Sequence, residues 1–123
     1  LLASGHGSLI NVASVAGLSG APLMSHYGAA KAAMISLTRS LAVEVAAGGL
    51  RVNALVPGWI ETDLTGFLRD DDHAESALLS GVPMARWGTA DEIAQAALFL
   101  ASDASSFMTG QTLIIDGGLS ATP

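Results

Sequence analysis

The sequence predicts an α/β fold that forms the C-terminal half of a doubly wound parallel sheet, with about three parallel strands and flanking helices. Three observations predict it. Short apolar runs of the kind that are covered on both faces recur along the chain, a segment with helical periodicity separates the first two, and glycine or proline flanks each run. The order strand, helix, strand is that of a parallel crossover. No repeat or low-complexity linker divides residues 1–123, which we interpret as a single partial domain.

The apolar runs are the predicted strands. They occupy residues 8–13, 51–56 and 112–116 and consist mainly of Leu, Ile, Val and Ala. Glycine precedes the first run, a Pro-Gly pair breaks the second, and a Gly-Gly pair ends the third. We therefore expect three short strands that are buried in the sheet.

Helical periodicity predicts two full helices. The first begins at about Met24 and ends at the glycine pair 48–49, and its apolar residues recur every three or four positions, at Ala30, Met34, Leu37, Leu41 and Val45. The second opens with a capping box from Thr89 to Glu92, and its apolar face consists of Ile93, Ala96, Ala97 and Leu100. Both helices are expected to pack on the sheet.

Residues 59–87 are expected to be irregular, and they hold six of the eleven acidic residues. A long polar insertion between packed elements is usually a lid or a binding loop. The acidic run at 70–72 with His73 has the chemistry to bind a hard cation, but no further ligand set accompanies it. We interpret the run as a solvated charged surface and predict no metal site.

The composition excludes several classes of function. Five basic residues against eleven acidic ones give a net charge of −6 and leave no basic stripe for nucleic acid. No apolar stretch reaches the roughly 20 residues of a membrane span. The chain has no Cys, which excludes a disulfide scaffold and a thiol nucleophile, and a reducing compartment, the cytoplasm, is compatible with this. Only 13% of residues are charged, about half the usual share of roughly 25%, so apolar surface should be buried against other polypeptide.

Tyr27 and Lys31 are a candidate catalytic pair. They are four residues apart in the predicted helix, so their side chains project from adjacent turns of one face. A free tyrosine has a pKa near 10, and a neighbouring ammonium lowers such a pKa toward the range that proton transfer near neutrality requires. The spacing alone also arises by chance on an exposed helix, so the neighbouring sequence has to support the pair.

That support comes from the ends of the predicted strands. Ser14 ends the first strand, Pro57 and Gly58 follow the second, and ligands of parallel sheets bind beyond the carboxyl ends of the strands. The Ser14 hydroxyl can hold a carbonyl oxygen that Tyr27 protonates. A glycine lets a flat ligand approach the backbone, and Thr62 can cap a short helix that follows.

Other polar residues are better explained without chemistry. Adjacent helical residues diverge by about 100°, so His26 is interpreted as a pocket-wall or surface histidine and not as a partner of Tyr27. Asn53 lies within a strand, away from the carboxyl edge, and is interpreted as structural. A serine hydrolase is excluded by the absence of a Gly-x-Ser-x-Gly elbow.

Taken together, these motifs resemble the short-chain dehydrogenases/reductases, and in particular the 3-oxoacyl carrier-protein reductases and the glucose or alcohol dehydrogenases of this family. The matching residues run from Asn11 to Ser14, from Tyr27 to Lys31 and through residues 51–62, followed by the segments 110–112 and 115–118. They follow one another in the family's order and cover nearly the whole chain.

The resemblance implies a Rossmann-like fold and hydride transfer between NAD or NADP and a ketone or secondary alcohol. It implies that Tyr27 is the acid/base, that Ser14 orients the substrate oxygen, and that Lys31 holds the nicotinamide ribose. It assigns the nicotinamide and nearby phosphates to the backbone around Pro57, Gly58 and Ile60 and to the Thr62 hydroxyl. Such enzymes are cytoplasmic and commonly assemble as tetramers, and the loop from Trp59 to about Arg86 closes over the substrate.

The family's nucleotide-binding half has no counterpart in these residues. Its glycine-rich turn would precede Leu1, and the run from Gly5 to Gly7 has Ile10 where a third glycine is needed. The chain starts without Met, and its first residues are typical of a helix end closed by Gly5. We therefore expect this C-terminal half to be inactive by itself. The alternatives are a non-catalytic oligomerisation or regulatory half, and an extended-branch epimerase or dehydratase, against which the Pro-Gly turn and the ending of 116–118 argue.

Overall fold

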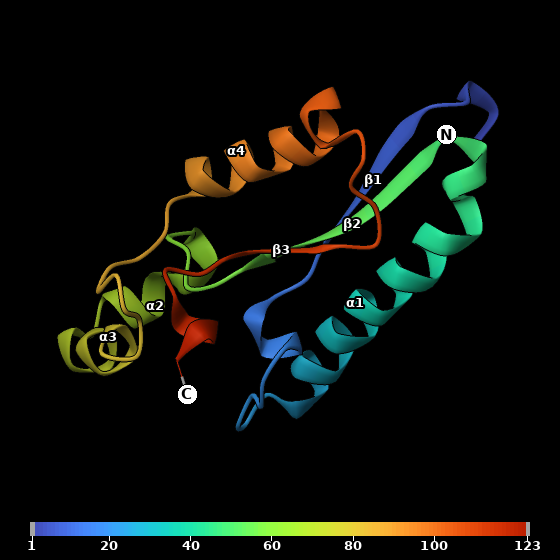
Figure 1. The fold of residues 1–123 in the computed structure, drawn as a ribbon. Coiled ribbons are helices and arrows are strands. Elements are labelled where there is room, and N and C mark those ends of the chain that lie inside the picture. The colour runs from blue at the N-terminus through green and yellow to red at the C-terminus, as the bar shows by residue number, and fades with distance from the viewer. Residues whose placement is uncertain (1, 123) are drawn as a thin grey trace.

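A parallel sheet of three strands forms the centre of the molecule. The computed structural model describes residues 2–122, with β1 at Gly7–Val12, β2 at Leu50–Pro57 and β3 at Thr112–Ile115. The spatial order is β1-β2-β3, and both neighbouring pairs are parallel (Figure 1). The predicted α/β fold with three parallel strands is confirmed, with strand ends that differ by one residue from the expected ones.

Two helices cover the two faces of this sheet. The helix α1 (Ser25–Val45) packs on one face and α4 (Ala90–Ala101) on the other (Figure 1). The side chains of β2 pack alternately against the two helices. Val52 and Val56 belong to the clusters beneath α1, whereas Leu55 packs with Leu100 of α4. This double coverage explains why the strand is an almost unbroken apolar run.

The buried face of α1 agrees in part with the predicted one: Met34, Leu41 and Val45 pack against the core clusters, whereas Ala30 and Leu37 are exposed. Its buried residues are Gly28, Ile35, Thr38 and Ala42. Leu37, expected in the apolar stripe, is 52% exposed. Leu37 and Val43 are apolar but exposed, so the period alone does not identify which apolar residues face the sheet.

The start of α4 agrees with the predicted capping box. The Thr89 side chain accepts a hydrogen bond from the Glu92 N–H, and the Glu92 carboxylate accepts one from the Thr89 N–H. At the other end of the helix, the Arg51 guanidinium of β2 donates to Ser105 Oγ at 2.8 Å and to the Ser102 carbonyl. The helix is therefore fixed at both ends.

Residues 59–87 are not irregular, which corrects the expectation. They form a 3-10 turn at Asp63–Thr65, the helix α2 at Gly66–Arg69 and the helix α3 at Asp72–Leu79. Asp71, in the acidic run, accepts hydrogen bonds from the N–H groups of His73 and Ala74 and thereby caps α3. These elements are short and locally capped, so they leave little periodicity in the sequence.

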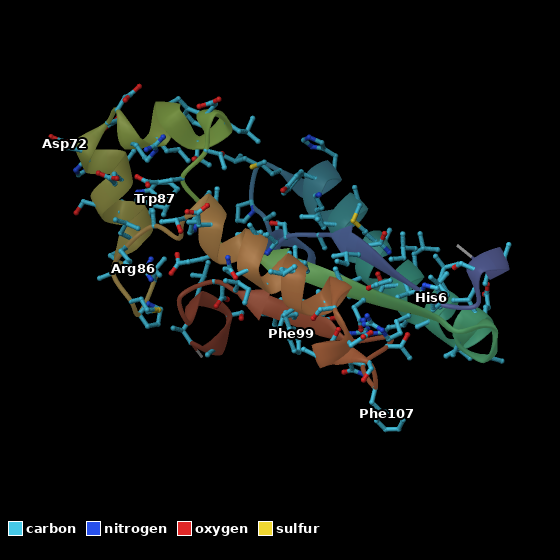
Figure 2. All side chains as sticks on the ribbon, turned by 90° about the horizontal axis from the view of Figure 1, so that it is seen from above. His6, Asp72, Arg86, Trp87, Phe99 and Phe107 are labelled. Carbon is cyan, nitrogen blue, oxygen red and sulfur yellow. The ribbon has the colours of Figure 1, made fainter. Side chains whose placement is uncertain are left out.

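The segment 62–80, which we call the lid, is loosely attached. Neither α2 nor α3 contains a buried residue, and both lie at one end of the molecule (Figure 1). The Trp87 indole N–H donates to the Glu75 carboxylate of α3 at 2.6 Å, and Trp87 packs edge-on against Trp59. Figure 2 shows Trp87 and Arg86 beside the lid helices. The Thr65 hydroxyl also donates to the Ile60 carbonyl at 2.8 Å, and Arg69 donates to the Glu61 carboxylate at 3.0 Å. A segment held by such polar contacts, without buried residues in its helices, is typical of one that opens locally.

The described chain begins with a 3-10 turn at Leu2–Ser4, and Gly5 follows with a φ of 70°. The predicted helix end closed by Gly5 therefore corresponds to a single tight turn, and Leu1 lies outside the described residues. No helix within residues 2–122 has the length and apolar character needed to cross a membrane.

Candidate functional site

The carboxyl ends of β1 and β2 lie side by side, and the candidate residues follow them. The register pairs Val12 with Leu55, and the Ala13 N–H donates to the Leu55 carbonyl at 2.8 Å. Continued by two residues, this register places Ser14 level with Pro57. The Ser14 end and the Pro57 end therefore form one edge of the sheet, as the sequence predicted.

Ser14 lies two residues beyond the end of β1. It is half-buried and is the N-cap of a 3-10 turn at Val15–Gly17, where its Oγ accepts a hydrogen bond from the Ala16 N–H at 3.2 Å. A hydroxyl that accepts in this way keeps its own hydrogen for donation to another oxygen. Capping and holding a substrate oxygen are thus compatible at this position.

Lys31 joins the helix to the end of β1. Its Nζ donates to the carbonyl of Val12, the last residue of β1, at 3.0 Å and lies 5.6 Å from the centre of the Tyr27 ring. Tyr27 is half-buried in the first turn of α1. The structure therefore brings the cation, the phenol and the end of the strand together.

The turn at Val15–Gly17 packs directly on the backbone of α1. A Cβ on Gly17 would lie 2.7 Å from the Ala32 nitrogen and from the Lys31 carbonyl carbon, and a Cβ on Gly28 would lie 3.0 Å from the Ala16 carbonyl oxygen. The turn that carries Ser14 is thus pressed against the helical turns that carry Tyr27 and Lys31. This contact places all three predicted catalytic residues in one corner.

The Pro57 side of the edge is built by close backbone contacts. The Gly58 N–H donates to the Ile115 carbonyl of β3 at 2.9 Å. Ile60 is buried and forms a bridge with Gly88, which joins the two ends of the segment that carries the lid. Thr62 is exposed and occupies the N-cap position of the turn Asp63–Thr65, where its N–H donates to the Thr65 hydroxyl at 3.0 Å.

A small cavity lies between this edge and the start of α4. Its volume is about 100 Å³, and its lining includes Trp59, Ile60, Met84, Arg86, Glu92 and Asp116. The Arg86 guanidinium donates to both carboxylate oxygens of Glu92, at 2.6 and 3.1 Å. This hydrogen bonding is the main reason that the pKa of Glu92 is lowered to about 2. The wall of the cavity therefore contains an ion pair in which Arg86 and Glu92 neutralise each other.

Two residues interpreted as non-catalytic lie where that interpretation expects them. His26 is exposed at the start of α1. Asn53 is fully buried, and its amide donates to the Met108 carbonyl and accepts from the Gln111 N–H, so it connects β2 to the segment before β3. Both agree with a wall or surface role for His26 and a structural role for Asn53.

Gly17 belongs to this corner although no sequence motif singles it out. Its importance comes from its distance to α1, which depends on how the chain folds back after residue 24. A Gly-x-x-Gly or Ala-rich loop before a helix gives no distinctive signal for such a contact. Only the packing of the turn on the helix identifies it.

Replacing Gly17 by Ala is expected to destabilise the protein by about 1–3 kcal/mol, because the new Cβ has to displace either the turn or the α1 backbone. Urea unfolding measures this loss. Gly20→Ala is the matched control, since a Cβ on Gly20 meets nothing within 4 Å. Equal stabilities of the two variants would show that the turn is not constrained by the helix.

Comparisons with known proteins agree with this geometry. The family described as enoyl-(acyl carrier protein) reductase matches residues 1–120. A 3-oxoacyl-(acyl-carrier-protein) reductase FabG of Chlamydia pneumoniae is 53% identical over 113 residues, which are 92% of this chain and 45% of that protein. A 2-dehydro-3-deoxy-D-gluconate 5-dehydrogenase of Bacillus subtilis is 45% identical over 118 residues, 96% of this chain and 46% of that protein.

A crystal structure gives the same fold. A gluconate 5-dehydrogenase from Burkholderia cenocepacia, in complex with NADP and tartrate, superposes with a TM-score of 0.94 and 42% identity, covering 99% of this chain and 48% of that one. The chain thus spans about half the length of the curated relatives it matches. Motifs, sheet topology and relatives agree, and the chain belongs to the short-chain dehydrogenase/reductase family.

Proposed function

We propose that this chain provides the catalytic corner and the nicotinamide side of an NAD(P)-dependent oxidoreductase that acts on a ketone or secondary alcohol. One observation carries the proposal: Lys31 Nζ lies 3.0 Å from the Val12 carbonyl and 5.6 Å from the Tyr27 ring, in the corner where Ser14 follows β1. The family relatives are named as reductases and dehydrogenases, which supports the same chemistry.

Each of the three side chains has a separate role in the reaction at the substrate oxygen. Ser14 donates its hydroxyl hydrogen to the carbonyl oxygen and holds it in place. Tyr27 delivers the proton that the oxygen needs when the carbonyl is reduced, and takes it back in the opposite direction. Lys31 keeps a positive charge beside the phenol, where negative charge develops when that proton leaves.

The residues of the edge fit a nicotinamide nucleotide. Val12 is the hydrogen-bond acceptor that the structure gives for Lys31, and an ammonium carries three N–H donors, so two can serve the ribose hydroxyls. The missing side chain of Gly58 makes room for Asp116, whose Cα and Cβ lie 2.7 Å from the Cβ position, and Thr62 exposes a hydroxyl. Pro57, Gly58, Ile60 and Thr62 would hold the nicotinamide and adjacent phosphate. When bound, the nicotinamide supplies or accepts the hydride.

Assembly and location belong to the same proposal. Phe107 and Leu98 are 106% and 61% exposed, on the side of α4 and the segment after it, and Figure 2 shows Phe99 and Phe107 there. Such apolar exposure together with a 13% charged fraction supports burial in an oligomer, for which we expect a tetramer. We expect this oligomer to act in the cytoplasm.

The proposal is tested with the full-length polypeptide that carries this chain. NADPH or NADH is mixed with a 3-oxoacyl thioester or a keto-sugar acid, the two substrate classes that the relatives' names suggest, and cofactor absorbance is followed. We expect oxidation of one cofactor with at least one carbonyl class. A folded protein that binds neither NADPH nor NADH, and oxidises neither with any carbonyl, would contradict the proposal.

A further inference from the structure

The turn that follows β3 touches two parts of the site at once. It starts at Asp116 and continues through Gly117 and Gly118 into a 3-10 turn at Leu119–Ala121. On one side it meets Gly58, and on the other it meets residues 82–84, where the chain returns from the lid. Figure 1 shows this turn leaving the carboxyl end of β3.

The Asp116 carboxylate holds this turn together. Its Oδ1 accepts from the Gly118 N–H at 2.9 Å, and its Oδ2 accepts from the Ser120 N–H at 2.7 Å. Both oxygens are thus used to fix backbone donors that follow within four residues. Partial burial favours the neutral form, but hydrogen bonds from Ser120 and Gly118 outweigh it and keep the pKa of Asp116 below its usual value. The side chain is therefore a charged acceptor that fixes the shape of the turn.

The backbone of Gly58 packs so closely against Asp116 that no side chain fits between them. A Cβ on Gly58 would lie 2.7 Å from both the Cα and the Cβ of Asp116. The Gly58 N–H is also bound to the Ile115 carbonyl at 2.9 Å. The position of Asp116 therefore sets the position of the Gly58 backbone, which lies on the proposed nicotinamide side.

The turn lies equally close to residues 82–84, where the chain returns from the lid. The Met84 N–H donates to the Gly117 carbonyl at 3.1 Å. A Cβ on Gly117 would lie 2.9 Å from Val82 Cγ1, and one on Gly118 would lie 3.0 Å from Pro83 Cγ. The return from the lid thus packs on the two glycines that the carboxylate holds in place.

We propose that Asp116 is a positioning residue that fixes, through one turn, both the Gly58 backbone of the nicotinamide site and residues 82–84, where the chain returns from the lid. This inference rests on the proposed function. Asp116 touches neither substrate nor cofactor in this role and acts through Gly58 and the lid. The geometry also predicts that the two regions move together, because the same turn supports both.

The test compares Asp116→Asn and Asp116→Ala in the full-length polypeptide, with Asp103→Asn as control. The amide keeps one of the two acceptor oxygens and the alanine keeps none, whereas Asp103 is an exposed carboxylate in the turn at Asp103–Ser105. We expect kcat to fall about 10- to 100-fold for the alanine variant, less for the asparagine variant, and not for the control, with a smaller change in KM.

Amide hydrogen exchange gives the readout that a general loss of stability would not reproduce. In both Asp116 variants we expect faster exchange in residues 57–62 and 81–88, and unchanged exchange in β1 and the centre of α1. Faster exchange throughout the protein, or unchanged exchange at 57–62, would overturn the proposal. If the unmodified protein reduces no carbonyl, the proposed function fails, while the exchange experiment still decides whether Asp116 couples the two regions.

Discussion

Replacing Tyr27 by Phe is expected to lower kcat for hydride transfer by about 10²- to 10⁴-fold, the range that a lost general acid costs. Phenylalanine keeps the ring that packs near Lys31 and removes only the hydroxyl that delivers the proton. Cofactor affinity should therefore stay nearly unchanged. Steady-state rates and a fluorescence titration with NADPH or NADH, made on the full-length polypeptide, measure the two quantities separately.

His26→Ala is the matched control for this variant. His26 is the preceding residue in the same first turn of α1 and is exposed. Its loss should leave kcat within a few-fold of the unmodified protein. Ordinary turnover by the Tyr27→Phe protein would show that another group donates the proton, and the catalytic corner would then need a different assignment.

Replacing Lys31 by Ala is expected to damage both turnover and cofactor binding. The substitution removes the cation 5.6 Å from the Tyr27 ring, the bond to the Val12 carbonyl and the donors available to the ribose. A hydrogen bond from a charged group contributes about 1.5–3 kcal/mol, so affinity should fall about 10-fold or more, together with kcat. The same rate and titration measurements apply.

Arg39→Ala serves as the comparison, because Arg39 is an exposed cation on the same helix. It tests whether the loss of any positive charge from α1 weakens a negatively charged cofactor. If both substitutions weakened binding equally, the effect of Lys31 would be general electrostatics and not a contact at the site. A normal affinity in the Lys31→Ala protein would remove Lys31 from the proposed ribose contact.

Much of the fold follows from local patterns. The capping box at Thr89 and Glu92 and the apolar face ending at Leu100 predicted α4, and the structure has both. The breaks after β2 and β3 were visible as proline and glycine pairs, because these residues end ladders wherever they occur. Such features depend on a few neighbouring residues, which is why a sequence can reveal them.

Other parts depended on partners far along the chain. In the predicted apolar stripe of α1, Met34 and Leu41 pack against the core as expected, but Leu37 is half-exposed. The fully buried positions include Ile35, Thr38 and Ala42, which the pattern did not single out. Thr38 at the sheet is satisfied by accepting from the Asn11 amide and donating to the Met34 carbonyl. A polar residue on a buried face is recognisable only when its partner on another element is known.

The sequence by itself determined the order of strands and helices, the ends of β2 and β3, and the candidates Ser14, Tyr27 and Lys31, because these rest on spacing, capping and chain-breaking residues. Only the tertiary structure decided which residues of α1 are fully buried against the sheet, that Gly17 and Gly58 lie against neighbouring backbone, and that the turn at Asp116 meets residues 82–84. The physical reason is distance along the chain: close packing between segments tens of residues apart is set by the fold as a whole and leaves no local pattern.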